Sequence, residues 1–156
     1  MMATPIGIIE LVATADRLCG IIIHPRSACV EIGTAPSDDV LVTAVTQLRE
    51  YFSGKRRDFD LPILPARTMR GAVLRAAINS ITYGETATYG QLARACDSSS
   101  RAMGQACARN PLPIIVACHR VTSSGNAPEH YSGGDGVSTK AWLTAHEARI
   151  SGKTLL

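Results

Sequence analysis

The chain of 156 residues lacks any apolar run long enough to cross a lipid bilayer. Its longest apolar runs, Gly20 to Ile23 and Ile114 to Cys118, fall far short of the roughly 20 residues that a membrane-spanning helix needs. The first residues also lack the basic start, apolar core and small-residue cleavage site of a secretory signal. We therefore expect no membrane association and a location in the cytoplasm.

Paired cysteine motifs are also missing. The chain has 5 cysteines, an odd number, and none of them forms a CxxC pair. This pattern favours neither a disulfide framework nor a zinc site, so we expect reduced thiols and no bound metal. The formal net charge of +3 is compatible with binding to nucleic acid but is too small to argue for it.

Residues 1–60 show the pattern of a small α/β domain. Apolar and β-branched residues on either side of "TADRLCG" predict two strands joined by a turn between Ile6 and His24. Ser37, Asp38 and Asp39 are candidate caps of a following helix that ends at Gly54. The segment "GKRRDFDLPILPAR" contains two prolines and reads as a linker, so we place the domain boundary at residues 60 and 61.

Residues 61–156 predict a mostly helical domain. Capping threonines precede two helical segments, "MRGAVLRAAINSI" after Thr68 and "YGQLARAC" after Thr88. The short polar break "DSSS" then leads into "RAMGQACARN", and two short helices with a tight join predict a helix-turn-helix. The glycine-rich "SSGNAPEHYSGGDG" is expected to lack regular structure before Ser138 opens a last helix.

Cys118 and His119 are the first candidates for chemistry. A cysteine in apolar surroundings is usually an inert part of the core, but a thiol with a pKa near 8.5 needs a basic partner to ionise at neutral pH. Because adjacent residues seldom face the same way, either the backbone turns sharply after Cys118 or His119 acts through a water. Glu147 could orient the imidazole if the last helix packs behind the site.

The segment "RAMGQACARN" has two interpretations. It can be a surface helix with solvated arginines, or the second helix of a helix-turn-helix with Arg101 at the end that enters a DNA groove. Its small residues, such as Ala102 and Gly104, would allow close approach to another surface. The "YSGG" loop can likewise be a plain surface loop or can line a pocket with backbone N–H groups.

Taken in order, these segments resemble one family. The strings "YGET", "TYGQLA", "RAMG", "NPLPIIVACHRV", "YSGG" and "K-W-L-HE" follow one another as in the O6-alkylguanine-DNA alkyltransferases. The N-terminal strings "TPIG" and "QLREYFSG" are similar to the small α/β domain of that family. The resemblance implies repair of O6-alkylguanine, with O4-alkylthymine as a further substrate, by irreversible transfer of the alkyl group to a cysteine without a cofactor.

The resemblance also implies roles for individual residues. Cys118 matches the acceptor cysteine, His119 its base acting through a water, and Glu147 the residue that orients the base. Asn110 would brace the turn, and Tyr89 would donate to guanine N3. The implied DNA contacts are Arg101, Ala102, Gly104, Thr88 and Arg109, and the implied pocket residues are Val121, Tyr131, Ser132 and Cys107. Arg101 would hold the space left by a flipped nucleotide in double-stranded DNA, with the protein acting as a monomer and associated with the nucleoid when bound.

The chain departs from the family pattern at four places, which include the altered start of "TMRGAVLRA" and a longer loop around "YSGG". The other two departures lie in the expected site. Ala117 stands where the family usually has proline, and Cys107 stands where a larger apolar residue is often found. A non-enzymatic alkyltransferase-like sensor of alkylated DNA is one rival, but its members replace the cysteine that is retained here as Cys118. A Cys-His-Glu hydrolase is the other, and it would leave the helix-turn-helix and Arg101 unexplained.

Overall fold

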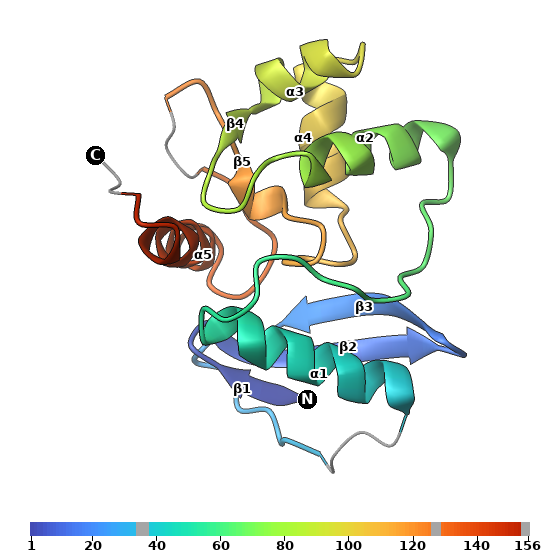
Figure 1. The fold of residues 1–156 in the computed structure, drawn as a ribbon, viewed down its shortest axis with the longest axis vertical. Helices are drawn as coiled ribbons and strands as arrows, with labels where there is room; N and C mark the ends of the chain where they lie inside the picture. The colour runs from blue at the N-terminus through green and yellow to red at the C-terminus, as the bar shows by residue number, and fades with distance from the viewer. Residues whose placement is uncertain (34–37, 126–128, 154–156) are drawn as a thin grey trace. The chain divides into compact units, whose positions relative to one another are not determined.

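The computed structural model describes residues 1–33, 38–125 and 129–153. The chain divides into two compact units, Met1–Leu64 with Gly133–Asp135 and Pro65–Ser132 with Gly136–Leu156. No helix within the described ranges is both long and apolar enough to span a membrane. The expected arrangement of a small sheet with a helix, followed by a mostly helical part, is confirmed (Figure 1).

The first unit is built on an antiparallel sheet. Strands β1 (Met2–Thr4), β2 (Gly7–Thr14) and β3 (Arg17–Ile23) lie in the order β1-β2-β3. In β3, Ile21 and Ile23 are buried while Ile22 between them is exposed, as the alternation of a strand with one covered face requires. The sequence pattern predicted β2 and β3 but not the short β1.

Helix α1 (Asp39–Phe52) packs on β2 and β3 (Figure 1). Its buried Leu48 and Tyr51 contribute to the core of this unit. Asp38 is the N-cap residue and makes no side-chain capping bond, while Ser37, the other candidate outside the helix, lies outside the described residues. The helix ends before Gly54, whose φ of 77° is the left-handed conformation that glycine adopts at helix ends.

The segment interpreted as a linker is partly tied to the sheet. Leu18 N donates to Pro62 O at 2.8 Å, and Leu64 N donates to Leu18 O at 2.8 Å. The buried side chain of Gln47 bonds both backbone groups of Asp60, accepting at 2.9 Å and donating at 2.8 Å. The prolines exclude a helix here, as predicted, but they do not prevent these isolated pairings.

Four helices dominate the second unit. They are α2 (Met69–Asn79), α3 (Tyr89–Ala95), α4 (Ser100–Ala108) and α5 (Val137–Ile150). The predicted caps Thr68 and Thr88 accept bonds from Gly71 N and Gln91 N, and Gln91 completes a capping box by accepting from Thr88 N. Helix α5 begins at Val137 without a side-chain cap, so the prediction that Ser138 opens it is off by one residue.

A tight connection joins α3 to α4. Asp97 has a φ of 50°, and Ser99 caps α4 by accepting from Ala102 N. Arg70 on α2 donates to Asp97 O at 3.2 Å and to Ser98 Oγ at 2.8 Å, which ties α2 to this turn. Buried Leu92 and Met103 contribute to the core of this unit.

The remaining elements of this unit are short. A 3-10 helix, η1 (Cys118–Arg120), leads into β5 (Val121–Thr122), which pairs in parallel with β4 (Ala87–Thr88). Residues 123–125 and 129–136 form no helix or strand, as predicted for this glycine-rich stretch. Residues 126–128 of the same stretch lie outside the described residues. Helix α5 contacts η1 and brings its buried face to the cysteine segment.

Candidate active site

A strained, buried segment places Cys118 at the start of η1. Leu112, Ile114 and Val116 are buried just before it, and Ile114 adopts a φ of 75°, which a β-branched residue rarely does. Such a conformation costs about 1–3 kcal/mol and persists only when the surroundings enforce it. The burial of the Ile114 side chain and the bond from Val116 N to Leu112 O at 2.8 Å hold the backbone in this conformation.

Asn110 stabilises this segment through both the NH2 group and the oxygen of its side-chain amide. Its Nδ2 donates to Val116 O at 2.9 Å and to Cys118 Sγ at 3.2 Å, while its Oδ1 accepts from Leu112 N at 3.0 Å. Burial raises the pKa of the Cys118 thiol, and the bond from Asn110 opposes that rise because it favours the thiolate. Asn110 therefore both shapes the turn and stabilises the charged form of the sulfur.

Ala117 N donates to Asn79 Oδ1 at 3.4 Å, which holds the residue before the cysteine. Ala117 has a φ of −78°, within the range that proline adopts, and is buried. The backbone at this position is thus compatible with proline, although proline would lose the bond to Asn79.

Replacing Asn110 by alanine should slow the reaction of Cys118 with an alkylating electrophile at neutral pH by about tenfold or more, since a hydrogen bond to a charged group contributes about 1.5–3 kcal/mol. The pKa of Cys118 should rise, so the rate should increase with pH over a higher range than in the unaltered protein. Single-turnover rates measured as a function of pH test this. Asn79→Ala is the matched control, because it loosens the same segment without removing a donor to the sulfur; an equal shift of its pH profile would contradict the assignment.

His119 and Glu147 form a buried pair. His119 Nε2 lies 2.7 Å from Glu147 Oε1, and their side chains are 0% and 1% exposed. Burial alone would raise the pKa of Glu147, but His119 and Arg120 outweigh it and hold that pKa well below its ordinary value. Gly84 N also donates to Glu147 Oε2, at 3.2 Å. The carboxylate is therefore ionised and fully bonded at neutral pH.

The ionised Glu147 determines the tautomer of His119. Since a carboxylate only accepts, Nε2 of His119 must carry the proton, and in the neutral ring Nδ1 is then the acceptor. Nδ1 is buried and has no hydrogen-bond partner among the described residues, Cys118 Sγ included. The backbone does turn sharply after Cys118, but the imidazole makes no direct bond to the thiol. This arrangement suits a base that reaches the sulfur through one water.

A cavity of about 240 Å³ opens onto the cysteine. It is lined by Tyr89, Gly104, Cys107, Ala108, Cys118, His130, Tyr131 and Ser132. Burial raises the pKa of Tyr89 to about 12, and the nearby thiols add to that rise. Burial likewise raises the pKa of Tyr131 well above its ordinary value, and its hydroxyl has no partner among the described residues. Both phenols are neutral hydrogen-bond donors at physiological pH.

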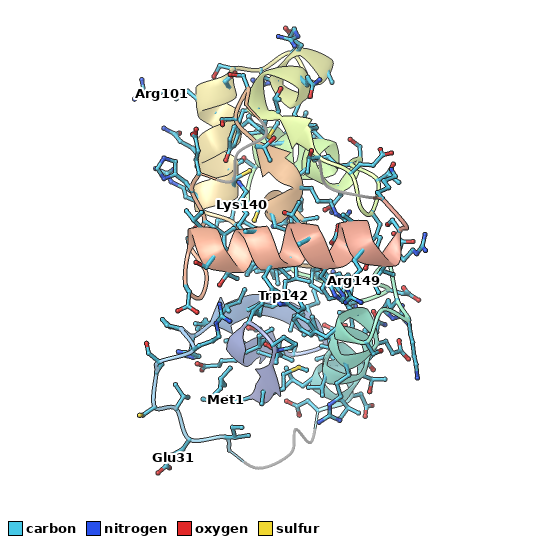
Figure 2. All side chains as sticks on the ribbon, turned by 90° about the vertical axis from the view of Figure 1, so that its left-hand side faces the viewer. Met1, Glu31, Arg101, Lys140, Trp142 and Arg149 are labelled. Atoms are coloured by element: carbon cyan, nitrogen blue, oxygen red, sulfur yellow. The ribbon has the colours of Figure 1, made fainter. Side chains whose placement is uncertain are left out.

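Three functional side chains were missed by sequence reasoning. Lys140 is buried on α5, on the side toward η1 (Figure 2), where its Nζ donates to His130 O at 3.3 Å and lies 5.8 Å from the centre of the Tyr89 ring. Burial lowers the pKa of Lys140, and its ammonium lowers the pKa of the Cys118 thiol. The sequence signal that could have identified Lys140 is a charged residue placed next to apolar residues in the last helix.

Arg120 is the second residue missed, and Asn79, described above, is the third. Arg120 donates from Nε to Glu147 Oε2 at 2.8 Å and from Nη2 to Glu147 Oε1 at 3.0 Å, a bidentate pair. Its Nη1 donates to Ile81 O at 2.9 Å. The signal in the sequence that could have identified Arg120 is its position directly after His119 in "CHRV".

The structure brings together only part of the expected site. Cys118, Asn110, Tyr89, Cys107, Tyr131 and Ser132 lie at or beside the cavity, and His119 and Glu147 lie behind the cysteine. Val121 is buried in β5, where its N–H donates to Cys118 O, and does not line the cavity. Within the described residues no group of three or more His, Cys, Asp or Glu side chains could hold a metal ion.

The expected DNA contacts lie on α4 or at the ends of α3 and α4. Arg101 and Arg109 are exposed, and Arg101 projects outward from the first turn of α4 (Figure 2). Ala102 and Gly104 are partly buried on the same helix, and no atom would lie within 4 Å of a Cβ added at Gly104. Thr88 is the N-cap residue of α3.

Comparison with known protein families covers both units. Residues 69–149 match the model of the 6-O-methylguanine DNA methyltransferase DNA binding domain. Residues 1–65 match the model of the 6-O-methylguanine DNA methyltransferase ribonuclease-like domain. The chain therefore belongs to the 6-O-methylguanine DNA methyltransferase family, in agreement with the resemblance drawn from its sequence.

Alignments with individual relatives cover most of the chain. It is 42% identical over 115 residues to the constitutive methylated-DNA–protein-cysteine methyltransferase of Bacillus subtilis, covering 72% of this chain and 68% of the relative. A methylated-DNA–protein-cysteine methyltransferase of Methanosarcina acetivorans is 33% identical, covering 84% and 86%. A solved structure of Mycobacterium tuberculosis OGT in complex with DNA matches with a TM-score of 0.80 at 29% identity, covering 96% and 92%.

Proposed function

We propose that this chain repairs O6-alkylguanine in double-stranded DNA by moving the alkyl group onto Sγ of Cys118, once per protein molecule and without a cofactor. O4-alkylthymine is a further substrate of the same site. The observation that carries this proposal is the position of Cys118 at the cavity, in front of the buried His119–Glu147 pair. The names of the relatives, methylated-DNA–protein-cysteine methyltransferases, support the same reaction class.

The first step is ionisation of the thiol. The proton of Cys118 passes through a bridging water to His119 Nδ1, the acceptor that the bond between Nε2 and Glu147 leaves available. The resulting imidazolium is stabilised by the carboxylate at 2.7 Å. Asn110 and Lys140 stabilise the thiolate, which offsets the effect of its burial.

The second step is displacement at the alkyl carbon. The thiolate forms an S–C bond as the bond between that carbon and guanine O6 breaks. The departing base keeps the electrons of that bond and takes up a proton from water, and the imidazolium of His119 returns its proton to water. Tyr89, neutral with a pKa of about 12, donates a hydrogen bond to guanine N3 as negative charge develops on the ring. Tyr131 and Ser132 line the pocket near the alkylated oxygen. Because regenerating the cysteine would require a thiolate, a poor leaving group, to depart from the alkyl carbon of the thioether, the protein is consumed in one turnover.

The target base must leave the duplex to reach the buried sulfur. We assign α3 and α4 as a helix-turn-helix whose second helix lies on the DNA, with the partly buried Ala102 and Gly104 allowing close approach. Exposed Arg101 enters the stack and fills the space of the flipped nucleotide, and Arg109 contacts phosphate. The protein acts as a monomer in the cytoplasm and is associated with the nucleoid when bound to DNA.

Replacing Arg101 by alanine should slow repair within a duplex by about tenfold or more while changing the reaction with free O6-alkylguanine little, since unstacking a base costs a few kcal/mol only in the duplex. Single-turnover rates on both substrates give the comparison. Arg49→Ala removes the same charge from α1 and should leave both rates unchanged. Equal slowing of Arg101→Ala on both substrates would remove the proposed role.

A stoichiometric assay separates the proposed function from its rivals. With O6-methylguanine duplex in excess, the amount of repaired base should equal the amount of protein and then stop increasing. A Cys-His-Glu hydrolase would continue to turn over, and a non-enzymatic sensor would bind without repairing. Either of those results would overturn the proposal.

A further inference from the structure

Two thiols line the same cavity. Cys107, in the last turn of α4, and Cys118, at the start of η1, both border the space of about 240 Å³. Asn110 joins them, because its N–H donates to Cys107 O at 3.3 Å while its Nδ2 donates to Cys118 Sγ at 3.2 Å. The transfer reaction uses only one of these sulfurs.

The two thiols differ in their environment. Cys118 receives a hydrogen bond from Asn110, whereas no described residue makes a hydrogen bond with Cys107 Sγ. Burial raises the pKa of Cys107 to about 12, and the negative charge of a Cys118 thiolate adds to that rise. Cys118 is therefore the thiol that ionises first, and Cys107 remains a protonated thiol in the lining of the same cavity.

We propose that Cys107 is a second acceptor, which captures the far end of a bifunctional alkyl group after Cys118 has taken its near end. The inference rests on the proposed transfer to Cys118, and the substrate class is an O6-alkylguanine whose alkyl group carries a second leaving group, such as a 2-haloethyl group. Such a group, once on Cys118, is still an electrophile inside the cavity that both thiols line.

The two proposed displacement steps need no oxidant or reductant. Cys118 Sγ bonds to the near carbon and guanine O6 departs from it, leaving an S-(2-chloroethyl) group on the protein. Cys107 Sγ then bonds to the far carbon, chloride leaves with the electrons of the C–Cl bond, and the thiol proton passes to water. The product is an ethylene bridge between two thioethers. Alkylation of Cys118 also removes its negative charge, so one cause of the raised pKa of Cys107 disappears as the second step becomes possible.

Capture would protect the DNA. Without a second thiol, the S-(2-chloroethyl) group on Cys118 reacts with water or with a nucleophile of the bound DNA, and the latter produces a covalent cross-link. Cys107 lies in the cavity with Cys118, so its thiol competes with both at high effective concentration.

Tryptic digestion distinguishes these fates, because cleavage after Arg101, Arg109 and Arg120 puts Cys107 and Cys118 on separate peptides. The protein is mixed with a freshly prepared duplex that contains one O6-(2-chloroethyl)guanine, and its products are analysed by mass spectrometry. We expect the peptides 102–109 and 110–120 to be joined by one ethylene unit. Hydroxyethylated 110–120 with a free Cys107 thiol as the main product would overturn the inference.

Two variants make the test specific. Among alkylated molecules, Cys107→Ser should reduce the bridged fraction about tenfold or more and increase hydroxyethyl and DNA-linked products, because a hydroxyl is a much weaker nucleophile than a thiol. This fraction does not depend on how fast the first transfer occurs. Cys29→Ser, which changes an exposed cysteine in the first unit, should retain the bridge. A bridged fraction that is the same in Cys107→Ser as in the unaltered chain would contradict the assignment.

A methylated duplex serves as the internal reference. If the proposed transfer is correct, O6-methylguanine adds one methyl group to 110–120 whatever the fate of the chloroethyl group. If neither duplex modifies the protein, the proposed function itself has failed. If the methyl group is transferred and the bridge does not form, only the role of Cys107 is lost.

Discussion

Cys118→Ala should lose alkyl transfer completely while keeping its affinity for DNA within about threefold, because the proposed binding uses α3, α4 and phosphate contacts rather than the thiol. No other described side chain combines a sulfur at the cavity with a bond from Asn110. Cys107 is not expected to take the alkyl group from guanine, since burial raises its pKa to about 12 and its sulfur has no donor among the described residues; the reaction proposed for it above needs an electrophile already held on Cys118.

The variant is checked by two measurements made together, single-turnover repair of an O6-methylguanine duplex and equilibrium binding to the same duplex. Cys19→Ser, in β3 of the first unit, is the matched control and should retain both properties. Residual transfer by Cys118→Ala would show that another group accepts the alkyl group. Loss of transfer together with loss of binding would indicate a folding defect instead.

Glu147→Gln should destabilise the protein by about 3–5 kcal/mol, because removing one partner of a buried ion pair leaves the other charge without compensation. Glu147 is 1% exposed and accepts from His119, Arg120 and Gly84. The same change should slow transfer strongly, since an amide no longer fixes the tautomer of His119. Unfolding by denaturant, followed by circular dichroism, measures the first effect and single-turnover repair the second.

Glu85→Gln provides the matched control for stability. Glu85 also forms an ion pair, with Lys153 at 2.6 Å, but both side chains are about half exposed. An exposed pair contributes little to stability, so this variant should unfold almost as the unaltered protein does. Equal destabilisation by the two substitutions would contradict the role assigned to burial.

The pH dependence of stability gives an independent check on Glu147. Its folded-state pKa lies well below the ordinary value of 4.5, so its contribution is fully present above that value and is lost as the pH falls below it. The free energy of unfolding should therefore decline as the pH is lowered from about 4.5, and the decline should be shallower in Glu147→Gln. Equal slopes for the two proteins would show that the carboxylate is not responsible.

Sequence patterns predicted the longer elements because their signals are local. The capping residue Thr88 with Gln91, and the apolar spacing that ends at Gly54, each lie within a few positions of the helix they define. Strand β1 and the β4–β5 pair were missed, since strands of two or three residues are too short to show a period. The pairing of Pro62 and Leu64 with Leu18 was missed because it joins residues more than 40 positions apart.

The same difference between local signals and long-range contacts applies to the candidate active site. The string "NPLPIIVACHRV" places Asn110, Cys118 and His119 in one short segment, and Glu147 in the last helix was a candidate to orient the imidazole before the resemblance implied the same role. Arg120, Lys140 and Asn79 act through contacts that link different elements, such as the bond from Arg120 to Glu147 across 27 positions. Sequence periodicity does not report such contacts, and only the folded packing of the elements in the second unit reveals them.

Locating the transferred group tests the central claim most directly. The protein is incubated with an O6-methylguanine duplex, digested with trypsin and analysed by mass spectrometry with fragmentation of the peptide 110–120. The account predicts one methyl group on Cys118, present in every molecule that has repaired a base. A methyl group on another residue, or repaired DNA with an unmodified Cys118, would contradict it.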